Sequence, residues 1–280
     1  MIKKKMPTAS KIYVALIFLF LYAPIIVLIL YSFNSTASTS VFTGFSLRWY
    51  KSLLHDEASL RSLYNTVILA VTSSVIATLL GSAAAVGINA IKNRHVRSSV
   101  MTVTNVPMMN PEIVTGVSMM LLFVFVGRLV GMKNVLAFQT MLIAHITFEL
   151  PYVILNVMPK LRQTDPHLPE AAMDLGCGPV RAFFKAVLPD IVPGIVSGFI
   201  MSFTLSLDDF VISYFTQGPT FETLPIKIFS MTKKRIKPDM YALSVIVFAA
   251  VLIMLILVNV AQARSDKKQM KSSAKAKEID

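Results

Sequence analysis

Four acidic residues lie within stretches that are otherwise strongly apolar: Glu112, Glu149, Asp208 and Asp209. A charged side chain at the centre of a bilayer costs roughly 2.5–3.5 kcal/mol on insertion scales, so each of these residues needs a reason to be there. The same stretches contain no Lys or Arg that could neutralise them. Such carboxylates suit either a water-filled path for a cation or the bracing of a neighbouring helix through hydroxyl or backbone groups.

The last two of these acids belong to a stretch with further polar side chains. Ser202, Ser206, Asp209 and Ser213 follow one another at intervals of three or four residues, which places them on one face of a continuous helix. Asp208 falls on an adjacent line. The stripe favours a path for a cation, and Asp209 is expected to face that path more than Asp208. A brace to a neighbouring helix is the alternative.

Glu149 follows His145 by four residues, so the two side chains share a helix face and can form a local pair. For Glu149 the path and the brace are equally open. His145 is interpreted as a packing histidine whose polar atoms are satisfied, rather than as a metal ligand, and no metal site is predicted. The single cysteine, Cys177, is interpreted as a small packing residue rather than as a catalytic thiol. No catalytic residue is predicted in the chain.

The elements that position these residues are predicted to be membrane helices. The chain is 55% hydrophobic and only 15% charged, whereas a soluble domain carries about 25% charged residues. A small-residue stretch at 81–87 suits the close approach of helices in lipid. Six apolar segments are long enough to cross a bilayer, which takes about 20 residues: 12–33, 63–91, 100–126, 134–158, 191–215 and 240–263.

The basic residues suggest how these helices are oriented. Most of the 27 Lys and Arg residues fall on one side if the N-terminus is cytoplasmic, which also puts the C-terminus there. The basic loop 227–237 on the opposite side is an exception. Because the net charge of +12 lies in loops and tails beside apolar segments, anionic lipid headgroups are a better partner than nucleic acid.

The loop between the fourth and fifth segments, 159–189, has its own helical pattern. A short helix can begin near Pro169, which places Glu170 in the first turn at the positive end of the helix dipole. Gly176 and Gly178 end this helix, and Pro179 allows a second short one. The shorter segment Phe45–Tyr50, FSLRWY, is a candidate interfacial helix.

The loop resembles the EAA loop of ABC importer permeases. The residues EAA at 170–172 are followed by Gly176 and, nine residues later, by a block ending in Leu188-Pro189. This block begins with Ala186, where the family pattern has Ile. The resemblance implies that the loop docks on a cytoplasmic ATPase dimer, and it assigns this coupling to Glu170, Ala171, Ala172, Asp174 and Gly176. The chain has no Walker A sequence, so ATP and Mg are expected in the partner ATPase and no cofactor in this chain.

A second resemblance concerns the substrate. The sequence from Ser202 to Met231, together with HITFELPY and FSLRWY, is similar to permease subunits of spermidine/putrescine importers. This family has a type I, MetI-like fold with six transmembrane helices. The resemblance places five residues on the substrate path: Trp49, Glu112, Ser206, Asp208 and Asp209. The family has Asp at the position of Glu112, and no acid at that of Glu149.

The sequence therefore predicts an all-α integral membrane protein that transports polyamines and catalyses nothing itself. Its expected partners are a second, homologous permease subunit, an ATPase dimer, an extracytoplasmic polyamine-binding protein and membrane lipids, in the cell membrane of a bacterium. Residues 1–61 hold the first helix and an outside loop, 62–263 the permease core, and 264–280 a basic, disordered tail. The alternatives are an ABC permease for ferric iron or an amino acid, and a proton-coupled carrier.

Overall fold

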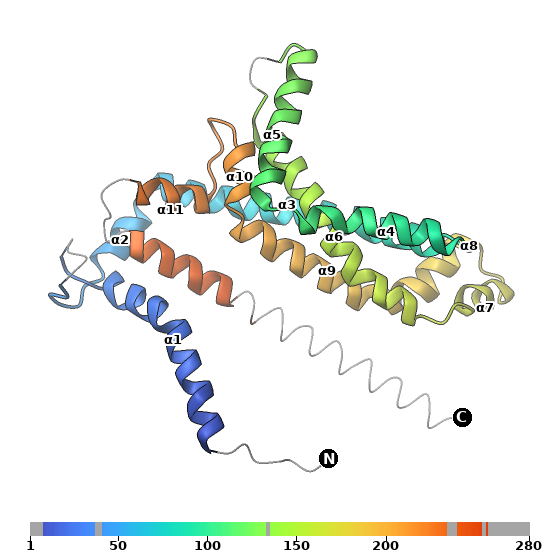
Figure 1. The fold of residues 1–280 in the computed structure, drawn as a ribbon, viewed down its shortest axis with the longest axis horizontal. Coiled ribbons are helices and arrows are strands. Elements are labelled where there is room, and N and C mark those ends of the chain that lie inside the picture. The colour runs from blue at the N-terminus through green and yellow to red at the C-terminus, as the bar shows by residue number, and fades with distance from the viewer. Residues whose placement is uncertain (1–7, 37–40, 133–134, 234–239, 254–255, 257–280) are drawn as a thin grey trace. The chain divides into compact units, whose positions relative to one another are not determined.

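The computed structural model describes the chain except for residues 1–7, 37–40, 133–134, 234–239, 254–255 and 257–280 (Figure 1). The described residues form helices joined by loops, and the only strand-like pairing among them is one bridge between Asn34 and Phe45. The prediction of an all-α membrane protein is confirmed. Five of the described helices are long and apolar enough to cross a membrane: Ser10–Ser32, Glu57–Ala90, Glu112–Leu129, Phe138–Gln163 and Pro179–Asp208.

The sixth predicted span, 240–263, is described only in part. Its beginning forms the shorter apolar helix Met240–Ile253. Most of its remainder and the whole of the predicted tail, 264–280, lie outside the described residues.

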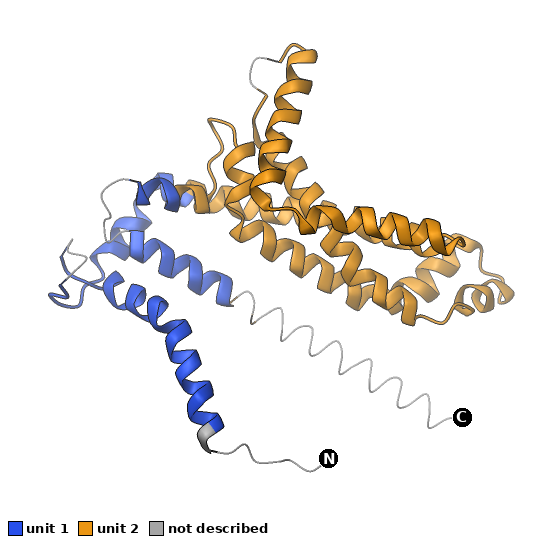
Figure 2. Cartoon of the chain, in the orientation of Figure 1, with its two compact units in different colours: residues 1–60, 228–252 blue, residues 61–227, 253–280 orange. Residues whose placement is uncertain are grey.

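The chain divides into two compact units: unit 1, residues 1–60 with 228–252, and unit 2, residues 61–227 with 253–280 (Figure 2). Unit 1 contains α1 (Thr8–Ser32), α2 (Arg48–Leu54) and all but the last residue of the helix Met240–Ile253.

The loop between α1 and α2 is organised by Asn34, whose side chain is fully buried. Its amide nitrogen donates to the Val41 carbonyl over 2.8 Å, and its amide oxygen accepts from the Thr43 N–H over 2.9 Å. Its backbone carbonyl accepts the indole N–H of Trp49 at 2.6 Å, which fixes the first turn of α2. A short helix exists in this segment, but α2 begins at Arg48 rather than at Phe45. Its place at the membrane interface stays a prediction.

Unit 2 contains, in whole or in part, the other helices. They are α3 (Glu57–Ala90), α4 (Arg94–Met109), α5 (Glu112–Leu129), α6 (Phe138–Gln163), α7 (Leu168–Asp174), α8 (Pro179–Ala182), the π-helix η1 (Phe183–Val187), α9 (Leu188–Asp208), α10 (Val211–Thr216) and α11 (Leu224–Thr232).

The core of unit 2 forms where α6 packs between α3 and α9, and glycines permit the close approach. A Cβ atom added at Gly81 of α3 would lie 2.7 Å from Val153 of α6, and one at Gly198 of α9 would lie 3.2 Å from the same side chain. Both distances are shorter than ordinary carbon contacts. The predicted role of the small-residue stretch is therefore confirmed at Gly81.

The third predicted span, 100–126, which the sequence interrupts at Asn110, Pro111 and Glu112, is divided between two helices. The structure has two helices, α4 and α5, which run in different directions from a break at Asn110 and Pro111 (Figure 1). Pro111 has no N–H to donate, and it disfavours helical geometry in the residue before it. α4 also begins earlier than predicted, because the Asn93 side chain caps its first turn by accepting the backbone N–H groups of His95 and Val96.

The loop that was predicted after the fifth span contains α11, which the sequence analysis missed. The approach to α11 is anchored to α3: the Leu224 N–H donates to the Thr66 hydroxyl at 2.7 Å, and the Asn65 amide donates to the Glu222 carbonyl at 3.0 Å. Pro225, at the second position of this helix, was the signal that could have revealed it.

Candidate functional site

The fifth predicted span, 191–215, is interrupted at its acidic pair. α9 ends at Asp208, Asp209 has an extended backbone, and α10 begins at Val211. The Asp209 carboxylate accepts the N–H groups of Ile212 at 3.2 Å and Ser213 at 2.7 Å. A carboxylate satisfies the free N–H groups of a helix start well, so Asp209 stabilises the break. The single helix face predicted for this segment is therefore wrong.

Asp209 also faces His145 of α6 inside the unit. The Nε2 atom of His145 lies 3.4 Å from the Asp209 carboxylate and 3.0 Å from the Ser213 hydroxyl, while its Nδ1 atom lies 2.7 Å from the Ser206 hydroxyl. All four residues are buried, with His145 only 1% exposed. The predicted packing histidine with satisfied ring nitrogens is confirmed, and Asp209 is not the more exposed acid.

Glu149 completes this buried network from the next turn of α6. Its carboxylate is fully buried and accepts the hydroxyls of Ser73, at 2.8 Å, and Ser202. His145 Nδ1 lies 3.8 Å away, so the predicted local pair is present. Of the two interpretations left open for Glu149, this geometry favours the brace, because the carboxylate ties α3, α6 and α9 together.

Ser73 is the member of the network that the sequence analysis did not single out. Its hydroxyl donates to Glu149 and lies 3.0 Å from the Ser206 hydroxyl. The signal was a run of three hydroxyl residues, Thr72 to Ser74, in the middle of an apolar span. Ser206, expected on the substrate path, lies in this buried network, where it contacts both His145 and Ser73.

Asp208 has a different environment from its neighbour, because its side chain is exposed on unit 2. It interacts electrostatically with Asp209 and with Glu112, which is exposed in the first turn of α5. α5 and α10 pack closely there, since a Cβ atom added at Gly116 would meet the Phe215 ring at 2.9 Å. Unit 2 therefore presents two carboxylates on its surface.

Trp49 lies in unit 1, whereas the other four residues assigned to the substrate path lie in unit 2. Its indole N–H donates a hydrogen bond to the Asn34 backbone carbonyl, and the Arg48 guanidinium lies over its ring, 5.5 Å from the centroid. The Trp49 residue as a whole is partly exposed.

The loop 159–189 forms the two short helices that the sequence predicts. Pro169 lies in the first turn of α7, with Glu170 beside it, and Pro179 begins α8. Contrary to expectation, the second helix does not end before the fifth span. It continues through η1 into α9, because the wider π-turn precedes Pro189 and accommodates its missing N–H.

The turn between α7 and α8 requires glycine at Gly176 for its backbone conformation. Its φ is +85°, and a Cβ atom there would meet nothing within 4 Å. The N–H groups of Gly176 and Cys177 donate to the carbonyls of Met173 and Ala172, which is the Schellman arrangement that ends helices.

The surface of this loop combines charge with exposed apolar side chains. Glu170, Ala171 and Asp174 are exposed and Ala172 is partly so. The Glu170 carboxylate lies 3.1 Å from His167 Nδ1, and this hydrogen bond, with the charge of Glu170, raises the pKa of His167. Three large apolar side chains nearby are also exposed: Leu175 (88%), Val180 (70%) and Phe184 (59%). Exposed apolar surface of this kind marks a protein interface.

Comparison with known proteins gives a consistent result. Residues 77–271 match the family described as binding-protein-dependent transport system inner membrane component. The chain is 35% identical over 260 residues to the putrescine transport system permease protein PotI of Escherichia coli K12, covering 93% of this chain and 92% of the relative. It is 37% identical over 240 residues to the spermidine/putrescine transport system permease protein PotC of the same strain, covering 86% and 88%.

Solved structures with a similar fold are also ABC transporters. One is a bacterial transporter for the import of alginate, with a TM-score of 0.72 at 17% identity, covering 91% of this chain and 94% of that one. Another is the MetNI methionine transporter, with a TM-score of 0.56 at 16% identity, covering 75% and 94%. These similarities show the fold.

Proposed function

The chain belongs to the family of binding-protein-dependent transport system inner membrane components, and we propose that it is the permease subunit of an ATP-driven polyamine importer. The observation that carries this function is the identity of 35–37% with two polyamine permeases over nearly the full length of both chains. Bacterial inner membrane is the corresponding location. The chain transports and is not an enzyme.

We assign the surface carboxylates to the substrate. Polyamines are flexible polycations, and a path for them must attract each ammonium group and still release it. Asp208 and Glu112 are exposed, and their like negative charges repel each other. Neither forms an ion pair with Lys or Arg among the described residues. Trp49, which is partly exposed, adds an aromatic ring for cation–π contact.

The buried network of Asp209, Ser206, His145, Glu149 and Ser73 supports that surface. It fixes the end of α9 and so determines where Asp208 points. Ser206 and Asp209 therefore contribute to the path by positioning its outer residue, rather than through their own exposed atoms.

The loop 159–189 is proposed to couple transport to ATP. Its exposed apolar side chains, Leu175, Val180 and Phe184, suit a groove on a cytoplasmic ATPase. Glu170, Ala171, Ala172, Asp174 and Gly176 shape α7 and its end, as the resemblance to the EAA loop implies. An ATPase dimer that holds ATP and Mg would then move α9 through the continuous helix from Pro179 to Asp208.

Three further partners follow from this function: a second, homologous permease, an extracytoplasmic polyamine-binding protein, and membrane lipid. Another solved relative of the same fold is an alginate transporter in complex with a ligand-bound periplasmic protein. Both termini of the chain are proposed to be cytoplasmic, since this places loop 159–189 where an ATPase can reach it.

Purification of the tagged chain from its own cells in mild detergent tests this assignment. We expect a P-loop ATPase and a second permease to co-purify in fixed ratio. A chain that purifies without an ATPase and still transports polyamine in liposomes would contradict the proposal. Replacing both Leu175 and Phe184 with Ser should release the ATPase and retain the second permease, whereas the same change at exposed Leu121 and Leu122 of α5 should leave the ATPase bound.

A further inference from the structure

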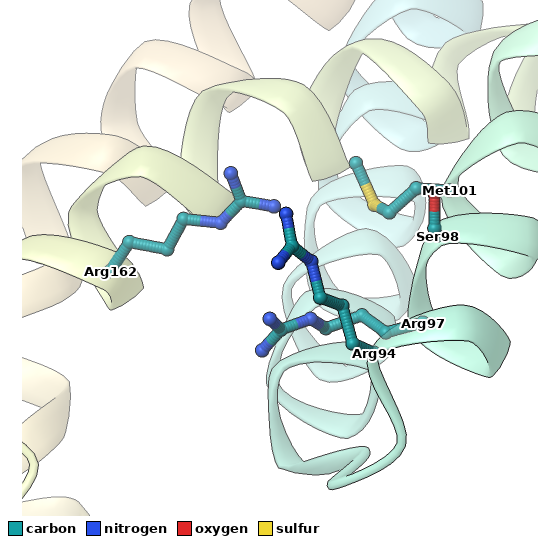
Figure 3. A pocket seen from close by; sticks show the side chains of 5 residues that line it. All are labelled: Arg94, Arg97, Ser98, Met101 and Arg162. Atoms are coloured by element: carbon teal, nitrogen blue, oxygen red, sulfur yellow. The ribbon is translucent and has the colours of Figure 1, made fainter.

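Three arginines converge on one cavity where α4 begins and α6 ends (Figure 3). Arg94 and Arg97 come from the first turn of α4, and Arg162 reaches toward them from the last turn of α6. Ser98 and Met101 complete the lining. The cavity has a volume of about 400 Å³, within the range of about 300–1,000 Å³ that is usual for small-molecule sites.

The positive charge of this cavity is not balanced within the described part of the chain. The ion pairs that the described residues form all involve a histidine, so none of the three guanidinium groups has a carboxylate partner there. The N-terminus of α4 adds the positive end of its helix dipole. Like charges that converge repel one another, so an anion in the cavity would stabilise the arrangement.

The chemistry of the lining indicates which anion fits. Guanidinium groups bind phosphate oxygens through paired N–H donors, and the Ser98 hydroxyl can add one more. Met101 gives the cavity an apolar wall, and α4 exposes the apolar side chains of Val96, Val103 and Val106 along its length. A ligand with a phosphate group and an apolar continuation matches this combination, and a basic pocket between membrane helices on the cytoplasmic side suits a lipid headgroup.

We propose that this cavity binds the phosphodiester headgroup of an anionic phospholipid in the cytoplasmic leaflet. The proposal rests on the membrane orientation given under the proposed function, but not on the substrate. The cavity does not belong to the substrate path, because three guanidinium groups repel a polycation. Arg162 lies in the last turn of α6, six residues before the first residue of α7. The bound lipid therefore holds the end of α6 from which the coupling loop starts.

Lipid binding to the intact importer complex tests the proposal. The complex is stripped of native lipid in detergent and titrated with phosphatidylglycerol or with zwitterionic phosphatidylcholine, and native mass spectrometry counts the retained lipids. We expect the wild-type complex to prefer phosphatidylglycerol. The triple variant Arg94→Gln/Arg97→Gln/Arg162→Gln should lose affinity for it by about fivefold for each charge removed.

The control variant Lys51→Gln/Arg61→Gln/Arg128→Gln removes three charges outside the cavity and should retain the lipid. Ser98→Glu provides a second test that keeps the arginines: its carboxylate would occupy the cavity and should also displace phosphatidylglycerol. Equal retention by the wild type and both cavity variants would overturn the proposal. So would displacement of the lipid by excess inorganic phosphate, which indicates a site for free anions, or loss of the ATPase from the triple variant with lipid retention unchanged.

Discussion

Asp208 and Asp209 are adjacent in sequence but occupy different environments. Asp208 is exposed and interacts electrostatically with Glu112, whereas Asp209 is 8% exposed, caps α10 and faces His145. A carboxylate that already accepts two backbone N–H groups and faces a buried histidine has little capacity left for a mobile cation. We therefore propose that Asp208 meets the substrate and that Asp209 holds it in position.

Replacing each aspartate with Asn separates these roles. Asp208→Asn should leave the yield of intact complex unchanged, because removing a charge lowers the cost of insertion. Polyamine uptake per complex should fall roughly fivefold, which is the size of one partly screened ion pair. Uptake of labelled polyamine, normalised to complex in the membrane, measures this effect. Normal uptake by this variant would remove Asp208 from the path.

Asp209→Asn should instead destabilise the complex. Asn has one accepting oxygen where Asp209 uses two, so one buried N–H of α10 loses its partner, and one of the two carboxylates near His145 is removed. An unsatisfied buried donor costs about 1–2 kcal/mol. Thermal unfolding of the purified complex should shift to lower temperature, with Thr147→Val, an exposed change on α6, as the unshifted control. If Asp209→Asn unfolds like the wild type but transports poorly, Asp209 acts on the substrate directly.

For single residues, the sequence identified most of the polar side chains but not which of them are buried and which are exposed. The acids, His145 and the serine stripe were visible because charge and hydroxyls are costly in apolar segments. Which acid is exposed depends on the helix break at Asp209, and that break arises from a hydrogen bond between a side chain and the following backbone. Spacing alone assumes a continuous helix, so it gave the opposite order of exposure.

The coupling loop depends on the conformation of Gly176. Because its φ is +85° and the space around it is open, a side chain there strains the backbone rather than colliding with a neighbour. Gly176→Val should cost about 1–2 kcal/mol locally and uncouple ATP hydrolysis from uptake. Gly176→Asn should be milder, since Asn tolerates this conformation. The measurement is the ratio of ATP hydrolysed to polyamine imported.

Gly178 provides the matched control for that experiment. A Cβ atom at Gly178 would likewise meet nothing within 4 Å, but its φ is negative. It occupies the N-cap position of α8, where serine is favourable. Gly178→Ser should therefore couple normally. Normal coupling by Gly176→Val would show that the turn is not needed.

The exposed pair of His167 and Glu170 gives the same loop a pH dependence. Because the pKa of His167 is raised, the attraction is complete below the ordinary pKa of histidine and is lost as pH rises through the raised value. Its effect on stability should be small, since both groups are exposed. In an NMR titration of ¹³C-histidine-labelled protein, Glu170→Gln should lower the pKa of His167 toward its ordinary value. An unchanged pKa would exclude the pair.

The sequence predicted long elements better than their interruptions. The spans beginning near residues 12, 63 and 134 correspond to α1, α3 and α6, because long apolar runs fix helices strongly. The break at Asn110 and Pro111 was marked by proline but read as an interruption within one span. The passage from α8 into α9 could not be predicted, since a π-turn accommodates a proline that would otherwise end the helix.

The proposed topology of the whole molecule rests on the placement of its basic residues and can be measured directly. In a chain carrying Cys177→Ser, cysteine introduced at position 52 should react with an impermeant reagent from outside. Cysteine introduced at position 98, in the lining of the arginine cavity, or at 272, outside the described residues, should react only after the inner face is opened. Labelling in the reverse pattern would invert the proposed orientation and remove the ATPase contact of loop 159–189.

Reconstitution measures most directly whether the chain imports polyamines with energy from ATP. The complex co-purified with its ATPase is reconstituted into liposomes with ATP at the ATPase face, the polyamine-binding protein at the other, and a protonophore present. We predict uptake of labelled spermidine or putrescine that requires ATP and is unaffected by the protonophore. Uptake that proceeds without ATP and stops when the proton gradient collapses would identify a proton-coupled carrier and contradict the assignment.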